Sequence, residues 1–336
     1  MPNPTRAQVH VDRPLTNISI AHIQSADSFV ASRVFPIIPV SKQSDTYFRY
    51  NRGDFNRDEM RKRAPGTESA GGGYNLDTDS YTAHVWAFHK DIDDQTLANY
   101  DEPLDANREA TIYITQKALI NREVEWAKNF FDVGGGQWGT DIAGHASVST
   151  PGTQVIHWNV AASNPITDIA YYQNAMLKAT GFEPNVLVLG KAAWDGLKNN
   201  EEILTRVQYG GNNSAPAMVT KQALAALFEV DEIVVMKAIA TATAEPTATS
   251  FADAQDYIGN SNGGLLCYRP PSVGLMTPAA GYTFAWTGLL GNSTFGTRIT
   301  TLPMNHLKSD RIEIESAYSQ NIIGADLGVY FTDLVP

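Results

Sequence analysis

The feature that most limits how this chain can fold is the contrast between roughly its first hundred residues and the segment that follows. From Met1 to about Tyr100 no stretch shows sustained helical periodicity, and apolar residues come in short clusters such as Phe35 to Val40. One very long helical pattern then begins. A front segment without its own core must be buried against something else, and other copies of the same chain are the natural candidate. The sequence therefore predicts an assembly protein.

Two extended segments are expected within this front part. Residues 1–40 are predicted to form an arm, because five prolines interrupt helical continuity and remove backbone donors. Residues 41–95 are predicted to form a long β-hairpin-like loop. Its limbs are the aromatic, β-prone stretches 46–50 and 81–88, and a polar, glycine-rich tip lies between them.

The long helical pattern is predicted to span residues 103–133 and to end at the glycines that follow. A seven-residue spacing places Ile112, Leu119 and Trp126 on one apolar stripe, with Phe130 four residues further on. Gln116 and Glu123 interrupt the stripe, and no second long helix follows. A single spine helix packed on a sheet is therefore favoured over a coiled coil. A second apolar stripe beside it contains Ile120, Val124, Ala127 and Phe131.

The middle of the chain alternates helices and strands. A helix is expected after Asn164, with Pro165 in its first position and Gly181 as its terminator. The apolar stretches 185–189 and 232–236 indicate buried strands, so a compact α/β unit is predicted. The other expected elements are helices over 191–198 and 220–228, an exposed loop over 238–250, and strands over 265–268, 282–286, 298–302 and 311–315.

The composition indicates in which compartment the chain folds and how its charge is distributed along the sequence. The single cysteine, Cys267, excludes an internal disulfide, and no signal region or membrane-length apolar run is present, so we expect folding in a cytoplasm. The net charge is −11, but residues 1–65 hold ten basic and six acidic residues, a balance of +4, which leaves −15 for the remainder. The basic loop residues Arg57, Arg61, Lys62 and Arg63 are predicted to contact acidic surface on a neighbouring copy. A phosphate-binding patch is the alternative.

The sequence contains no recognisable catalytic, cofactor or metal site. Gly134, Gly136 and Gly139 match the letters of a dinucleotide fingerprint, but a helical pattern precedes them where a strand is required. No two histidines have the spacing of a helical zinc site, and no serine occupies a nucleophile elbow. Asp91, Asp93 and Asp94 are interpreted as a polar junction before the spine helix. A non-enzymatic protein is predicted.

The order of arm, two-limbed loop, spine helix, α/β lobe and returning C-terminal strand resembles the major capsid proteins of tailed bacteriophages, with their Hong Kong 97-type α+β fold. Two local segments add to the resemblance. Pro165-Ile-Thr-Asp-Ile-Ala-Tyr-Tyr172 is followed by Gly181-Phe-Glu-Pro-Asn-Val-Leu-Val-Leu-Gly190, and this pairing of a helix with a buried strand is similar to that in many phage coat proteins. The resemblance covers essentially the whole chain.

The resemblance implies an N-arm over 1–40, an extended loop over 41–95, a peripheral domain over 96–184 and 303–336, and an axial domain over 185–302. It also implies hexamers and pentamers that close into an icosahedral shell around double-stranded DNA, in a virion capsid assembled in the host cytoplasm. The partners would be further copies of the chain, a separate scaffolding protein, a portal protein and a possible decoration protein, with no membrane. The alternatives are a nanocompartment (encapsulin-like) shell protein and an α/β enzyme whose site is unrecognised.

Overall fold

A six-stranded mixed sheet forms one lobe of the protein. The computed structural model describes residues 23–100, 105–131, 136–147, 150, 152–210, 219–241, 255–274, 276–290 and 297–336. In this lobe the strand order is β6-β5-β15-β11-β7-β8. The strands are β5 (Thr140–His145), β6 (Gln154–Ile156), β7 (Val186–Leu189), β8 (Glu232–Val235), β11 (Gly264–Cys267) and β15 (Gly328–Thr332). The helices of the lobe are α6 (Pro165–Thr180), α7 (Lys191–Lys198), α8 (Glu201–Gly210) and α9 (Lys221–Leu227).

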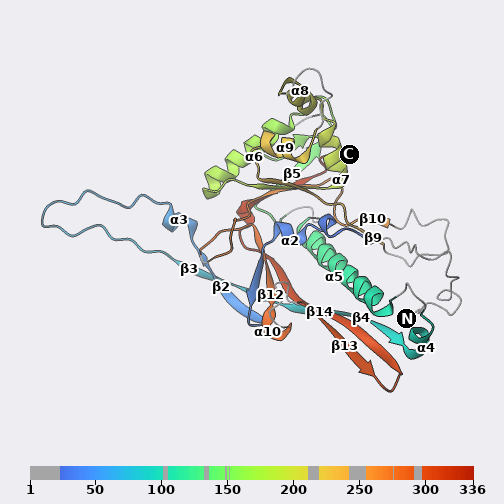
Figure 1. Ribbon diagram of the computed structural model, residues 1–336. Coiled ribbons are helices and arrows are strands. Elements are labelled where there is room, and N and C mark those ends of the chain that lie inside the picture. Colours follow the sequence, from blue (N-terminus) through green and yellow to red (C-terminus); the bar gives the residue numbers. More distant parts are fainter. Residues whose placement is uncertain are drawn as a thin grey trace.

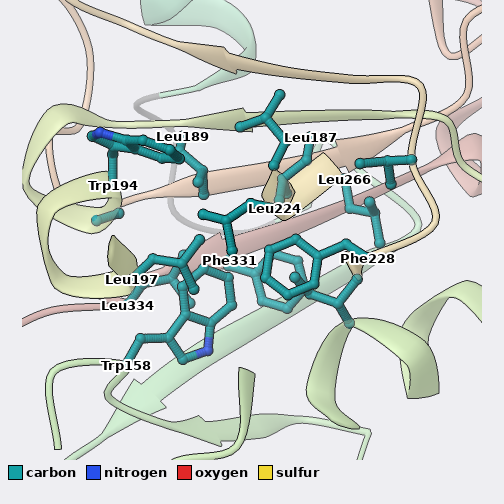
Figure 2. Packing of buried hydrophobic residues seen from close by; sticks show 14 of the residues in the cluster. Trp158, Leu187, Leu189, Trp194, Leu197, Leu224, Phe228, Leu266, Phe331 and Leu334 are labelled. Carbon is teal, nitrogen blue, oxygen red and sulfur yellow. The ribbon is translucent and has the colours of Figure 1, made fainter. Parts of the chain in front are cut away.

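Strand β7 shows why this sheet is buried on both faces. Its four residues are apolar and buried, and successive side chains point to opposite faces. Leu187 and Leu189 join a core with Trp158, Leu197 and other residues of the surrounding helices and strands (Figure 2). Val186 and Val188 join a second core on the other face, which includes the end of the long helix.

Helix α6 forms as predicted. The Asn164 Oδ1 atom accepts the Thr167 N–H at 3.0 Å, and Pro165 is the first helical residue. Gly181 ends the helix with a φ of 81°, and its N–H donates to the Leu177 carbonyl at 2.8 Å. The local capping chemistry is therefore sufficient to place both ends of this helix.

A second, five-stranded sheet carries the spine helix. Its path is β1-β12-β14-β13, with β4 paired along β14. The strands are β1 (Ile37–Val40), β4 (His84–Asp93), β12 (Gly281–Trp286), β13 (Thr297–Met304) and β14 (Ser309–Ile322). Helix α5 (Ala106–Phe130) packs on β4 and β14 through a small cluster that includes Ile92, Ala110, Ile114 and Ile312. Figure 1 shows α5 running beside this sheet, below the six-stranded lobe.

A two-stranded ribbon projects from the body on one side (Figure 1). Its strands, β2 (Ser44–Tyr50) and β3 (Leu76–Thr82), pair antiparallel from Ser44 with Thr82 to Tyr50 with Leu76. The remaining elements are η2 (Ala26–Ser28), α2 (Ala31–Val34), α3 (Arg52–Phe55), α4 (Asp94–Ala98), β9 (Ile239–Thr241), β10 (Gln255–Tyr257), α10 (Thr287–Leu290) and η4 (Ala325–Leu327).

The front of the chain is more buried than its pattern suggested. Residues 29–35 contribute Phe29, Val30, Ala31, Val34 and Phe35 to the core shared by α5 and the six-stranded sheet. The expectation that the front part lacks a core within its own chain is therefore wrong for these residues. The apolar clusters of this segment are too short to show a helix or strand period, yet they fill the space between α5 and the six-stranded sheet. Residues 1–22 of the predicted arm lie outside the described residues.

The second limb of the predicted loop also differs. Tyr81 and Thr82 end β3, but residues 84–93 form β4 and pair with β14 across more than two hundred residues of sequence. The aromatic, β-prone composition of residues 81–88 predicts a strand but cannot specify its partner. The ribbon therefore ends near residue 82, although the loop was predicted to continue to residue 95.

The spine helix begins later and presents a different stripe than predicted. Asp105 caps its N-terminus by accepting the Asn107 N–H at 3.0 Å, and residues 103–104 and 132–133 of the predicted span lie outside the described residues. Trp126 and Phe130 are buried and Leu119 is half-buried, but Ile112 is 37% exposed, so its predicted place in the packed stripe is wrong. A seven-residue repeat drifts around a straight helix, and Ala110 and Ile114 contact the sheet there instead.

Sheet membership crosses the predicted domain boundaries at residues 185 and 302. Strands β5, β6 and β15 lie in the sheet that holds β7, β8 and β11, whereas β12 and β13 pair with β14 in the other sheet. The predicted exposed loop over 238–250 begins with the buried Ala238 and with β9, and residues 242–250 lie outside the described residues.

None of the helices in the described ranges combines the length and apolar character needed to cross a bilayer.

Candidate assembly surfaces

The two strands of the ribbon are largely exposed in the single chain. These strands alternate side chains between two faces. One face carries Phe48, which is 65% exposed, with Tyr50 and Leu76 further out; the other carries Tyr47 and Arg49. A two-stranded ribbon is marginally stable in water unless something packs against it. The apolar face is therefore a candidate contact surface.

Aromatic stacking fixes the base of the ribbon on the five-stranded sheet. The Phe284 ring stacks on Tyr81 with ring centroids 4.5 Å apart and on Tyr47 at 5.6 Å. The Tyr47 hydroxyl donates to Asp79 at 3.0 Å, and burial of Tyr47 raises its pKa. The ribbon consequently leaves the body in a defined direction, since its base has a core of its own.

The tip of the ribbon holds a small aromatic cluster outside the body. Tyr50, Phe55 and Tyr74 contact one another with centroid separations of 5.7–5.9 Å. Phe55 and Tyr74 remain 51% and 59% exposed, and Met60 is 92% exposed. Such a concentration of exposed apolar side chains on a projecting element is typical of an interaction surface.

The four basic residues singled out in the sequence do not share one environment. Arg57 is neutralised within the loop by Asp54 at 2.8 Å and Glu59 at 3.3 Å. Arg63 donates to the Thr67 carbonyl, also within the loop. Arg61 and Lys62 lie on the exposed tip.

Arg52, which the sequence did not single out, ties the ribbon to the body. It donates to the Ala179 carbonyl at 2.5 Å and pairs with Asp326. Only the fold brings the end of α6, η4 and the ribbon together, so no local signal could have identified this arginine.

The acidic residues before the spine helix have structural partners. Asp91 forms a two-point ion pair with Arg311, with bonds of 2.8 and 3.0 Å, and this contact lowers the pKa of Asp91. Asp93 caps α4 by accepting the Thr96 N–H at 2.7 Å. Within the part of the chain that the structure describes, no three His, Cys, Asp or Glu side chains are grouped to hold a metal ion.

The one cysteine is inert in the fold. Cys267 is completely buried in the six-stranded sheet, and burial raises the pKa of its thiol to about 12. A thiol that stays protonated at neutral pH is a poor nucleophile.

Comparison with known proteins identifies the fold. The major capsid protein of Burkholderia phage BcepMu is 22% identical over 325 residues, which cover 95% of this chain and 94% of that protein. A phage-related protein of Bordetella bronchiseptica RB50 superimposes with a TM-score of 0.65 at 20% identity, covering 93% of this chain and 94% of that one. The mature capsid of bacteriophage PhiM1 gives a TM-score of 0.58 at 13% identity, covering 98% and 94%. The chain has the fold of phage capsid proteins.

The predicted α+β fold class and the resemblance to phage capsid proteins are thus confirmed. No family model matches the sequence. The holo-SrpI encapsulin complex of Synechococcus elongatus PCC 7942 also matches, with a TM-score of 0.53 at 13% identity, covering 96% of this chain and 95% of that one.

Proposed function

We propose that this chain is a major capsid protein of a tailed phage, which assembles into hexamers and pentamers of an icosahedral shell around double-stranded DNA. The observation that carries the proposal is the ribbon: a rigidly rooted element whose apolar face and aromatic tip are exposed in the single chain. The BcepMu relative, which spans nearly the whole chain, supports a capsid role.

The mechanism is one of geometry. The base of the ribbon is fixed by Phe284, and the outer end of its strands is tied to the body by Arg52, so the ribbon keeps a constant direction. A neighbouring copy that covers Phe48 and the tip aromatics would remove apolar surface from water at roughly 25 cal/mol per Å². Each contact is modest, but a closed lattice repeats it at every subunit. No catalytic step is part of this role.

The family organisation supplies the remaining proposals. A separate scaffolding protein, a portal protein and a possible decoration protein would be the partners of assembly in the host cytoplasm. Residues 1–40 would serve as the N-arm, with a peripheral domain over 96–184 and 303–336 and an axial domain over 185–302. Strands β12 and β13 would belong to the peripheral part, because they pair with β14 in the same sheet.

The register of the ribbon offers a direct test. Tyr50 and Leu76 are paired, so residues 51–75 can be replaced by an Asn-Gly turn that closes the two strands into a short hairpin. We expect the shortened chain to fold with a normal circular dichroism spectrum but to remain unassembled in sedimentation velocity and negative-stain microscopy. Shells of normal size from this variant would contradict the proposal.

Charge reversal at the tip separates the contact role from phosphate binding. The change of Arg61, Lys62 and Arg63 to glutamate should suppress shell growth measured by light scattering without DNA, while Arg57→Gln, whose charge is already neutralised within the loop, should assemble normally. If the triple variant assembles normally and only DNA retention falls, the phosphate-binding alternative is correct.

A nanocompartment shell is the second candidate, favoured by the encapsulin match. The two functions differ in what the particle encloses. Particles purified from the native source should contain nucleic acid under the capsid proposal, and cargo protein without nucleic acid under the alternative. The absorbance ratio at 260 and 280 nm of purified particles distinguishes them.

A further inference from the structure

Residues 29–35, here called the root segment, lie between the two lobes of the molecule. The segment includes helix α2 and continues directly into β1 of the five-stranded sheet. Phe35 contacts Trp126 and Phe130 of the spine helix, with ring centroids 5.8 and 5.0 Å apart. The same core contains Val188 and other residues of the six-stranded sheet. The segment therefore touches both lobes at once.

A buried carboxylate holds the N-terminal end of the root segment. Glu123 of α5 has no exposed surface, and its two oxygens accept the N–H groups of Val30 at 3.0 Å and of Ala31 at 2.9 Å. A carboxylate is costly to bury unless hydrogen bonds compensate its lost hydration. These backbone donors offset part of that cost, so the side chain and the segment depend on each other.

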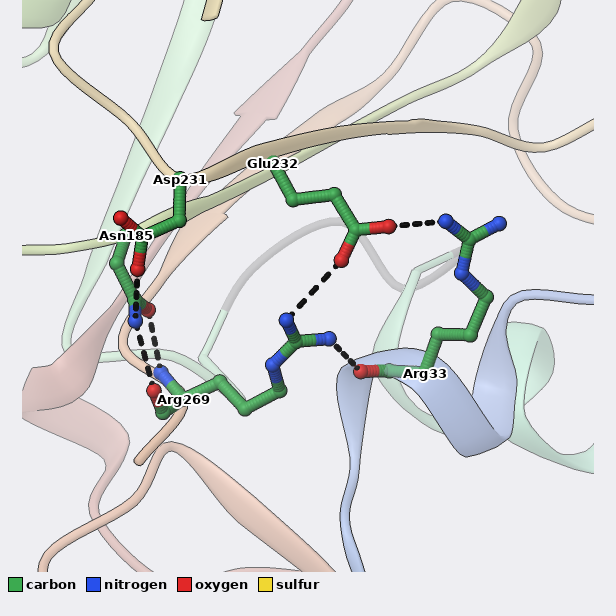
Figure 3. A network of polar contacts seen from close by, with 5 residues as sticks. All are labelled: Arg33, Asn185, Asp231, Glu232 and Arg269. Carbon is green, nitrogen blue, oxygen red and sulfur yellow. Dashed lines mark hydrogen bonds and ion pairs between the residues drawn. The ribbon is translucent and has the colours of Figure 1, made fainter. Parts of the chain in front are cut away.

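An arginine of the other lobe holds the C-terminal end. Arg269 donates to the Arg33 carbonyl at 2.5 Å and to Glu232 at 3.0 Å, and Arg33 itself pairs with Glu232 (Figure 3). Asn185 fixes the backbone of Arg269 from both sides, by accepting its N–H and by donating to its carbonyl, each at 2.8 Å. This end is consequently fastened to β8 and to the loop after β11 of the six-stranded sheet.

Hydrogen bonds within the segment make it one unit. The N–H groups of Arg33 and Val34 donate to the Val30 carbonyl, and that of Phe35 donates to Ala31, at 2.9–3.0 Å. Because one turn of helix connects the two ends, loss of the contacts at one end should loosen the other end as well.

We infer that the root segment is a latch between the spine helix and the six-stranded sheet, and that Glu123, Arg269 and Glu232 are positioning residues that set how the two lobes meet. The ribbon is rooted on the lobe that carries the spine helix. The latch thereby acts with the direct contacts of Arg52 to set the direction of the ribbon relative to the six-stranded sheet. Its part in assembly rests on the proposed function, whereas its part in the fold does not.

Hydrogen exchange of the full-length chain tests the latch. Glu123→Gln replaces one of the two acceptor oxygens with an NH2 donor. Glu232→Gln weakens the ion pairs at the opposite end, where the side chain is partly exposed. Because the segment opens as a unit, each variant should accelerate exchange by at least about tenfold at both ends, at Val30 and Ala31 and at Val34 and Phe35. The amides of β7 should be unchanged. Glu125→Gln, on the same helix but half-buried, is the matched control.

Three outcomes would overturn the inference. Exchange that accelerates only at the end nearest each substitution would mean that the segment does not act as a unit. Unchanged exchange in both variants would mean that the polar contacts do not hold it, and equal acceleration in Glu125→Gln would mean a general loss of stability. If both variants also assemble into shells of wild-type diameter and uniformity, the latch does not position the lobes for assembly, and the capsid proposal itself is unaffected.

Discussion

Truncation of Trp126 should be among the most destabilising single changes in the chain. The side chain is completely buried and contacts three aromatic rings, Phe35, Phe130 and Phe131, with centroids 5.8, 6.4 and 5.8 Å away. Replacing a buried tryptophan with alanine typically costs about 3–5 kcal/mol. The three aromatic contacts place Trp126→Ala at the upper end of that range, since each adds roughly 0.5–1.5 kcal/mol beyond buried area.

Urea unfolding followed by far-ultraviolet circular dichroism measures this loss on unassembled subunits. Ile112→Ala is the matched control, because Ile112 lies on the same seven-residue stripe but is 37% exposed. It should change the free energy of unfolding by no more than about 0.5 kcal/mol. Trp126→Phe should cost less than Trp126→Ala, because the indole N–H has no hydrogen-bond partner in the described part of the chain. Equal losses at Ile112 and Trp126, or wild-type stability of Trp126→Ala, would refute the assignment of the packed face.

Three further changes probe separate parts of the structure. Burial raises the pKa of Glu123 from 4.5 to about 7 despite the opposing backbone hydrogen bonds, so the folded chain keeps a proton that the unfolded chain loses. The free energy of unfolding should therefore fall by on the order of 3 kcal/mol as the pH rises from about 4.5 to about 7, and Glu123→Gln should remove this part of the slope in urea titrations. Gly181→Ala should cost about 1 kcal/mol in the same assay, because Gly181 has a φ of 81°; no loss would show that the helix end readjusts. Phe284→Ala should accelerate hydrogen exchange across β2 and β3 while β7 stays protected, and uniform exchange in both places would contradict the aromatic anchor.

The sequence alone determined the elements whose signals are local. Helix α6 starts and ends where its asparagine cap, N-terminal proline and terminal glycine place it. The stretches 186–189 and 232–235 form strands as predicted, and all their residues are buried except the half-buried Glu232. The order of loop, long helix, α/β lobe and C-terminal strands carried the resemblance to phage capsid proteins, and that order can be predicted from local turn and capping chemistry.

Only the tertiary structure decided which distant segments meet. Strand β4 pairs with β14 and not with the other limb of the loop. The composition of a strand does not specify its partner, so the sequence could not predict this pairing. The root segment is too short to show periodicity, yet it is buried by two lobes that are far apart in sequence. Glu123 seemed a polar interruption of an apolar stripe, and the fold makes it the cap of α2. The orientation of a helix stripe, the partner of a strand and the environment of a buried charge all depend on contacts between residues that no local pattern connects.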